Sequence, residues 1–129
     1  YFKTVPNDRC TFCETHQEDI HHILLYCRFT KNLWSNLHTF IVDKTGVDLL
    51  LTDQDRLFGN KLLPFPDLYN HILILTKQYL YACRCLGEKP DFNVLSRKID
   101  REHKIELVSY SGENLDSYSS RKWEPLYPP

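Results

Sequence analysis

Three cysteines and one histidine near the N-terminus have the chemistry and the spacing to bind one metal ion. Cys10 and Cys13 are separated by two residues, so one tight turn can direct both thiolates at a single point. His22 follows after eight intervening residues, and Cys27 after four more. Three thiolates and one imidazole match the tetrahedral coordination of Zn²⁺, with metal–ligand distances of about 2.0–2.3 Å. Four protein ligands leave no position for water, so the spacing predicts a structural zinc site.

The alternatives for this stretch are a disulfide or three unrelated buried thiols. A disulfide between the first two cysteines would leave Cys27 unexplained, and the chain has five cysteines, an odd number that does not suit a disulfide framework. Mg²⁺ and Ca²⁺ are disfavoured because they prefer oxygen ligands. The choice of histidine is open among His16, His21 and His22. His22 is favoured because the His-x4-Cys spacing is also used by small zinc knuckles.

Residues around the four ligands extend the pattern. An acidic residue and Ile20 stand just before the His-x4-Cys arm, and Trp34 lies seven residues beyond the last cysteine. Together with Cys-x2-Cys, this arrangement resembles the zinc-binding region downstream of the reverse transcriptase in LINE-type (non-LTR) retrotransposons. Further segments look like that family's helical tail: Lys77–Leu86, Lys89–Phe92, Ile105-Glu106 and Lys122-Trp123. The resemblance covers most of the chain, and Gly112 departs from it by interrupting an expected helical run.

The resemblance implies a function that composition alone would not give. It implies the C-terminal module of a reverse transcriptase polypeptide, which binds template RNA or target DNA and positions it during target-primed reverse transcription. The remainder of that polypeptide would be a partner, and the setting would be intracellular, in the cytoplasm and nucleus. The alternative is a structural or protein-interaction module in which zinc only stabilises the fold.

Composition and length exclude several classes of protein. With 129 residues, of which 42% are hydrophobic, the chain can bury a core. No apolar run approaches the roughly 18 residues of a membrane span, so we expect no membrane partner. The chain has no methionine and begins at Tyr1, so we expect a fragment or a processed piece of a longer protein.

Hydrophobic periodicity predicts a mostly α fold, a small helical domain of four or five helices with an N-terminal Cys-Cys-His-Cys zinc finger. We expect the finger and the first helix in residues 1–46 and a helical part in residues 47–129, packed on each other as one compact unit. The expected helices are 18–43, ending near Gly46; 52–58, capped by Thr52; one from Asp67 to Gly87; one capped by Asp91; and a short one after Gly112.

The helix pattern has consequences for the spacing of two candidate ligands and for the expected hydrophobic core. On an ideal α-helix His22 and Cys27 are about 500° apart, so they do not share a face. Either the helix begins after His22, or the metal lies over a distorted first turn. The expected core combines Trp34 with two apolar stripes, namely Leu68, Ile72, Leu75, Tyr79 and Cys83, and then Phe92, Leu95, Ile99, Ile105 and Val108.

Cations in two places are candidates for nucleic-acid contacts. The whole chain has 16 basic and 17 acidic residues, so no global field attracts a polyanion. Residues 77–104 hold seven basic against four acidic residues, a local excess of three. We assign the candidate contacts to Arg9, Phe12, Arg28 and Lys31 beside the finger and to Arg97, Lys98, Arg101 and Lys104 farther on. Phe12 either presents its ring for stacking on a base or packs against Trp34 in the core.

The sequence carries no catalytic motif. It has no glycine-rich phosphate loop, nucleophile elbow or zinc-protease signature. Its closest carboxylate pair, Asp53 and Asp55, lacks the third partner that a two-metal polymerase site would need. We therefore expect this piece not to be an enzyme, although the parent protein resembles an RNA-directed DNA polymerase.

Overall fold

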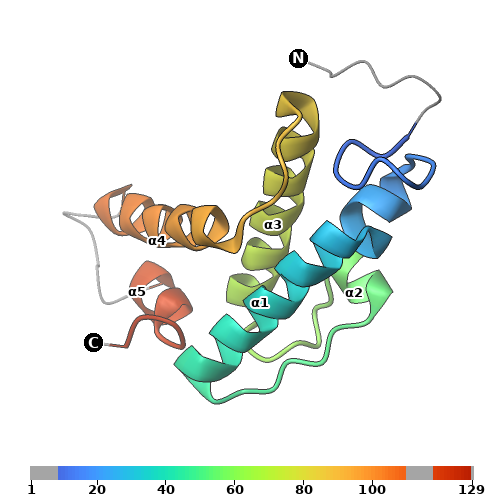
Figure 1. The fold of residues 1–129 in the computed structure, drawn as a ribbon. Helices are drawn as coiled ribbons and strands as arrows, with labels where there is room; N and C mark the ends of the chain where they lie inside the picture. The colour runs from blue at the N-terminus through green and yellow to red at the C-terminus, as the bar shows by residue number, and fades with distance from the viewer. Residues whose placement is uncertain (1–8, 110–117, 129) are drawn as a thin grey trace.

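The chain folds into a set of packed helices, as its hydrophobic periodicity predicts. The computed structural model describes residues 9–109 and 118–128, and in those ranges the sole strand-like feature is one antiparallel bridge between Arg9 and Gln17. The helices are η2 (His22–Tyr26), α1 (Arg28–Thr45), α2 (Asp53–Phe58), α3 (Pro66–Leu86), α4 (Phe92–Ser109) and α5 (Tyr118–Trp123) (Figure 1). The predicted mostly α fold, with a Cys-Cys-His-Cys cluster near the N-terminus, is confirmed.

The first predicted helix is not continuous. A helical segment over residues 20–26 ends in the π-helical η2, and the backbone then becomes extended at Cys27, with φ −60° and ψ 139°. α1 begins at the next residue and ends at Thr45, followed by Gly46 in the left-handed conformation. The prediction of one helix over 18–43 was therefore wrong at Cys27 and correct about its end.

Local sequence signals account for the start of α2 and for the start of α3. Thr52 and Asp55 form a capping box, because each side chain accepts a hydrogen bond from the other residue's backbone N–H. The predicted cap of α3 was wrong: Phe65 is the N-cap and Asp67 lies in the first turn. Pro66 takes the first helical position, where its fixed φ suits the helix and its missing N–H costs nothing.

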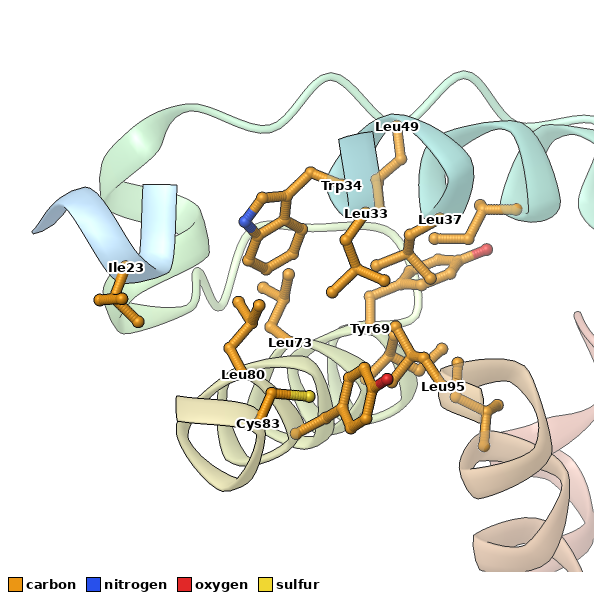
Figure 2. Packing of buried hydrophobic residues seen from close by; sticks show 14 of the residues in the cluster. Ile23, Leu33, Trp34, Leu37, Leu49, Tyr69, Leu73, Leu80, Cys83 and Leu95 are labelled. Carbon is orange, nitrogen blue, oxygen red and sulfur yellow. The ribbon is translucent and has the colours of Figure 1, made fainter. Parts of the chain in front are cut away.

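α1 and α3 form the centre of the core. Trp34 is 6% exposed, as predicted, and Figure 2 shows Trp34 and Leu33 of α1 facing Leu73 and Leu80 of α3. The predicted stripe of α3 is buried at Leu68, Ile72, Tyr79 and Cys83, and partly buried at Leu75. A single cluster of buried hydrophobic residues extends from Cys10 to Leu126.

α4 follows the prediction in its first half only. The Asp91 carboxylate accepts a hydrogen bond from the Asn93 N–H at 2.8 Å, and Leu95 and Ile99 are fully buried. Ile105 and Val108 were predicted to be buried and are 45% and 71% exposed. The reason is that the second half of α4 contacts the C-terminal segment with its polar face.

The C-terminal segment packs on α4 and α3 through Trp123, which is fully buried. Its indole N–H donates to Glu106 at 3.0 Å, and the His103 ring stacks on Tyr127 with 4.0 Å between ring centroids. The short helix expected after Gly112 corresponds to α5, while Gly112 and Leu115 themselves lie outside the described residues. No helix in the described part of the chain has the length and hydropathy that crossing a bilayer requires.

Candidate metal centre

The four predicted ligand residues lie together and are buried. Cys10, Cys13, His22 and Cys27 each direct one ligand atom to a common point, and these atoms are all within 4.8 Å of one another. None of the four residues is more than 9% exposed. These residues could therefore hold a metal ion shielded from solvent.

Two of the six distances between these ligand atoms are close to those of a tetrahedron around one ion. The Cys10 and Cys27 sulfurs are 3.8 Å apart, and the Cys13 sulfur is 3.4 Å from His22 Nε2. With Zn–S of about 2.3 Å and Zn–N of about 2.0–2.1 Å, tetrahedral angles give separations of about 3.8 Å between two sulfurs and about 3.6 Å between sulfur and nitrogen. A disulfide needs about 2.05 Å between its sulfurs, so the pair Cys10–Cys27 is not one.

A tight loop brings the first two cysteines together. The Cys10 N–H donates to the His16 carbonyl at 2.8 Å, and the Glu14 N–H donates to the Cys10 carbonyl at 2.9 Å. Glu14 has φ +58°, which lets the chain reverse within this loop. The Phe12 N–H points at the Cys10 sulfur, 3.3 Å away, which stabilises a negatively charged sulfur.

The π-helical η2 solves the spacing problem of the other two ligands. The Cys27 N–H donates to the His22 carbonyl at 2.8 Å, an i→i+5 bond that closes one wide turn between the two ligands. Side chains five residues apart, which diverge on an α-helix, can then approach the same ion. Of the two alternatives left open by the sequence, the structure shows the distorted turn.

The wide turn leaves carbonyl groups without helical partners, and two side chains of α1 satisfy them. The Thr30 hydroxyl donates to the Ile23 carbonyl at 2.6 Å, and the Trp34 indole N–H donates to the Leu24 carbonyl at 2.8 Å. At the other end, the Asp19 carboxylate accepts from the His22 N–H at 2.8 Å. Trp34 is thus both a core residue and a support for the ligand turn, a role that the sequence analysis missed.

The structure selects His22 among the three histidines. His22 is buried within the cluster, whereas His21 and His16 are exposed. His16 lies nearby, with Nδ1 3.7 Å from the Cys13 sulfur, but it also contacts the Thr15 hydroxyl at 3.0 Å. It is therefore a neighbour of the cluster and lies outside its set of four ligand atoms.

The electrostatic environment differs between the cysteines. Burial raises the pKa of the Cys10 thiol, and the adjacent Cys27 adds to the rise. Burial also opposes ionisation of Cys13, but hydrogen bonds from Thr15, together with His16 and His22, outweigh it and lower the pKa of that thiol. Metal binding requires thiolates, so a bound ion must displace the Cys10 proton, and the affinity depends on pH.

One carboxylate, that of Glu18, anchors the finger loop to α3. Glu18 accepts from the Thr11 N–H at 3.0 Å and from the Thr11 hydroxyl at 2.7 Å. Its other oxygen accepts from Arg84 Nε at 3.0 Å and from a terminal guanidinium nitrogen at 2.7 Å. Burial acts to raise the pKa of Glu18, but the Thr11 and Arg84 contacts prevail and lower it.

The residues predicted to contact nucleic acid are one aromatic residue, which is buried, and two groups of cations, which are exposed. Phe12 is 1% exposed, so the prediction that its ring is presented for stacking was wrong, and the alternative of a core position holds. Arg9, Arg28 and Lys31 are exposed around the cluster. On α4 all four cations are exposed, but Lys104 pairs with Asp100 at 2.9 Å and Lys98 lies over the Tyr79 ring.

A second group of possible ligands joins α3, α4 and α5. His71 lies 3.5 Å from Glu102 and 3.3 Å from Glu106, and the three residues are half-buried. The Lys122 ammonium is 2.8 Å from His71 Nδ1 and 3.2 Å from a Glu106 oxygen. Because Lys122 already supplies the positive charge, this group is a balanced network between helices, and a metal ion would have to displace the ammonium.

The other cysteines do not form a second centre. Cys83 is buried in the core and Cys85, two residues further along α3, is half-buried, and neither belongs to a ligand group in the described residues. Comparison of the chain with protein-family models, with curated proteins and with solved structures found no match. The candidate function therefore depends on the geometry of this centre and of the surface around it.

Proposed function

We propose that Cys10, Cys13, His22 and Cys27 bind one structural Zn²⁺ and that the chain is a zinc-stabilised module for binding RNA or DNA. The observation that supports zinc is the buried set of three sulfurs and one nitrogen within 4.8 Å of one another, with two separations close to the tetrahedral values. Zinc would supply folding free energy at this centre, because it fastens residues 10–27 into one unit. Four protein ligands leave no site for catalysis at the metal.

The nucleic-acid part of the proposal is supported by cations beside the metal centre. Arg28 and Lys31 lie one turn apart at the start of α1, directly after the ligand Cys27, and Lys89 lies near Arg28 across the Phe29 ring. None of these three cations forms an ion pair with a residue of the described ranges. Cations without acidic partners remain available to phosphate groups.

The resemblance to LINE-type reverse transcriptases extends this proposal. In that reading the module is the C-terminal part of a longer reverse transcriptase polypeptide and positions template or target during target-primed reverse transcription. The alternative function is a structural or protein-interaction module. It is favoured by one observation: the aromatic ring of the finger loop, Phe12, is buried and thus serves the core.

Binding measured against salt separates these two functions. Zinc-loaded protein would be titrated with single-stranded RNA, single-stranded DNA and duplex DNA at several salt concentrations. Three or four phosphate contacts give a slope of log K against log salt of about −2 to −4. Absence of binding to all three at low salt, by protein shown to be folded and zinc-loaded, would support the structural alternative.

A further inference from the structure

A groove with polar amides and aromatic walls lies beside the metal centre. It has a volume of about 770 Å³ and is lined by residues of α1, of the segment that joins α3 to α4 and of the start of α4. This volume is in the range of sites that hold small ligands, about 300–1,000 Å³. The residues that matter here are Phe29, Asn32, Asn36, Lys89 and Asn93.

Two cations contact the Phe29 ring at one end of this groove: Lys89 lines the groove, and Arg28 reaches the same ring from just outside it. The Arg28 guanidinium carbon is 5.0 Å from the centre of the Phe29 ring, and Lys89 Nζ is 4.8 Å from it. Both cations are exposed, and their contact within the described residues is with the ring, not with a carboxylate. Such cations gain more from a phosphate group than they lose by leaving the ring, because a charge pair is stronger than an exposed cation–π contact.

Exposed amides follow the cations along α1. Asn32 and Asn36 are four residues apart and therefore lie on one face of the helix, about 6 Å from each other along its axis. Asn93 contributes a third amide from the opposite wall. An amide offers a donor and an acceptor side by side, the arrangement that pairs with the edge of a nucleic-acid base.

The two ends of the groove differ in charge, with cations at the end of Phe29 and a carboxylate at the end of Asp43. Asp43, near the C-terminal end of α1, lies about 22 Å along the axis from Arg28 and disfavours phosphate there. The other carboxylate of the groove, Asp91, accepts from the Asn93 N–H at 2.8 Å, and Lys89, two residues before it, carries the opposite charge. Phosphate is thus favoured at the end nearest the metal centre, and a chain of few nucleotides fits better than a long track.

We propose that this groove binds a short stretch of single-stranded nucleic acid, with Arg28 and Lys89 on phosphate and the three amides on base edges. This inference rests on the proposed function and assigns a location to it. A single strand is the fitting occupant, because its unstacked bases expose the edges that a duplex keeps in its grooves. The cations of α4 are a poorer location, since Lys104 already pairs with Asp100 at 2.9 Å.

The test measures the affinity of the protein for short single-stranded homo-oligonucleotides of each base, as RNA and as DNA, and for a DNA duplex, at several salt concentrations. Arg28→Gln with Lys89→Gln should weaken binding to all single strands and reduce the salt slope by about 1.4, or 0.7 for each lost contact. Asn36→Ala should leave that slope unchanged and reduce discrimination between bases by roughly 5- to 150-fold, the value of one bidentate pair. Asn36→Asp, which keeps the shape and adds a negative charge, should weaken binding further.

The matched control is Arg97→Gln with Arg101→Gln, which removes the same charge from the exposed face of α4. Zinc content and thermal unfolding of each variant establish that it is folded. If wild-type protein binds and the control variant loses more affinity than the groove variant, the groove assignment is wrong and the proposed function stands. Tighter binding of duplex than of single strands also overturns the assignment. If wild-type protein binds no nucleic acid, the proposed function fails, and the groove assignment fails with it.

Discussion

Among single residues, the adjacent pair His21 and His22 gives the sharpest test of the metal centre. His22 lies in the cluster 3.4 Å from the Cys13 sulfur, and His21 is exposed. We expect His22→Ala to lose most of its zinc, because one of four ligands is absent, while His21→Ala keeps about one zinc per chain. Elemental analysis after gel filtration measures both. Loss of zinc from the His21 variant alone would show that the wrong histidine was assigned.

Glu18 should contribute to stability more than its place in a loop suggests. It makes two contacts with Thr11 and two with Arg84, and so joins the finger loop to α3. Glu18→Gln keeps the size of the side chain and removes its charge. We expect a loss of roughly 1.5–3 kcal/mol in the free energy of unfolding, the range for hydrogen bonds to charged groups. Denaturant titration of zinc-loaded protein measures it.

The exposed pair Asp100 and Lys104 provides the comparison for Glu18. Their contact is as short, at 2.9 Å, but Lys104 is 71% exposed. Solvent screening reduces such pairs to about 0–1 kcal/mol, so Asp100→Asn should cost less than the Glu18 change. Equal costs for the two variants would contradict the argument that Glu18 anchors the loop.

The cluster of Cys10, Cys13, His22 and Cys27 could be predicted from the sequence because its chemistry and spacing are local. The position of Phe12 could not, because a ring between two ligand cysteines can face either solvent or core. Only the packing of the finger loop on the helices decides this. Glu18 and Arg84 were not identified for the same reason, since 66 residues separate them.

Two glycines that follow helices should differ in how much stability is lost when each is replaced by alanine. Gly46 after α1 and Gly59 after α2 both have positive φ, +71° and +77°. An added Cβ at Gly46 meets nothing within 4 Å, but at Gly59 it would be 2.6 Å from Asn70 Oδ1. Asn70 accepts from the Asn60 N–H and donates to the Asn60 carbonyl, so moving it disrupts the start of the next connection.

We expect Gly46→Ala to cost about 1 kcal/mol through the left-handed backbone alone. Gly59→Ala should cost at least twice that. Its ψ of 177° places it in a region that only glycine adopts readily, and the clash adds to the strain. Thermal or denaturant unfolding of the two variants measures the difference. Similar stabilities would show that Asn70 moves without loss.

The elements were predictable where a local rule sets them. Thr52 and Asp91 act at helix starts through their side chains, and Gly46 and Gly87 act at helix ends through a left-handed backbone; the sequence identified all four. The π-turn and the break at Cys27 were not predictable from periodicity, because they depend on donors from α1. The burial of Ile105 and Val108 was mispredicted, because an apolar stripe does not show which face the C-terminal segment covers.

Across the molecule, the network of His71, Glu106 and Lys122 couples stability to pH. Burial lowers the pKa of His71, Lys122 lowers it further, and the two glutamates offset part of the shift. The unfolded chain therefore binds a proton more readily than the folded chain. This contribution is fully present above the unfolded pKa of about 6.5 and is lost as pH falls through the folded pKa.

Unfolding measured at pH 7.5, 6.5 and 5.5 tests this coupling. Wild-type protein should lose more stability over that range than His71→Gln, which lacks the titrating ring. Protonation of the metal ligands affects both proteins equally, so the difference between them reports His71. Parallel losses in the two proteins would show that His71 is not the responsible group.

Metal removal should unfold more than the finger, because the ligand cysteines belong to the same core cluster as Trp34, Leu73 and Leu80. Structural zinc in finger peptides is worth on the order of 10–16 kcal/mol, which is comparable to the usual stability of a whole domain, about 5–15 kcal/mol. We therefore expect a strong chelator to abolish packing between α1 and α3 and, with it, the contacts of α4 and α5.

The two tryptophans report the two ends of this core separately. Trp34 lies beside the ligand turn, and Trp123 is buried in α5 against Glu106. In Trp123→Phe the fluorescence comes from Trp34, and in Trp34→Phe it comes from Trp123. Chelator titrations of both variants should give complete emission shifts, reversed by added Zn²⁺, because one cooperative core unfolds as a unit. Trp34→Phe should shift at a lower chelator concentration, because it loses the indole hydrogen bond that supports the ligand turn. A shift of Trp34 without a shift of Trp123 would mean that the metal stabilises the N-terminal part alone.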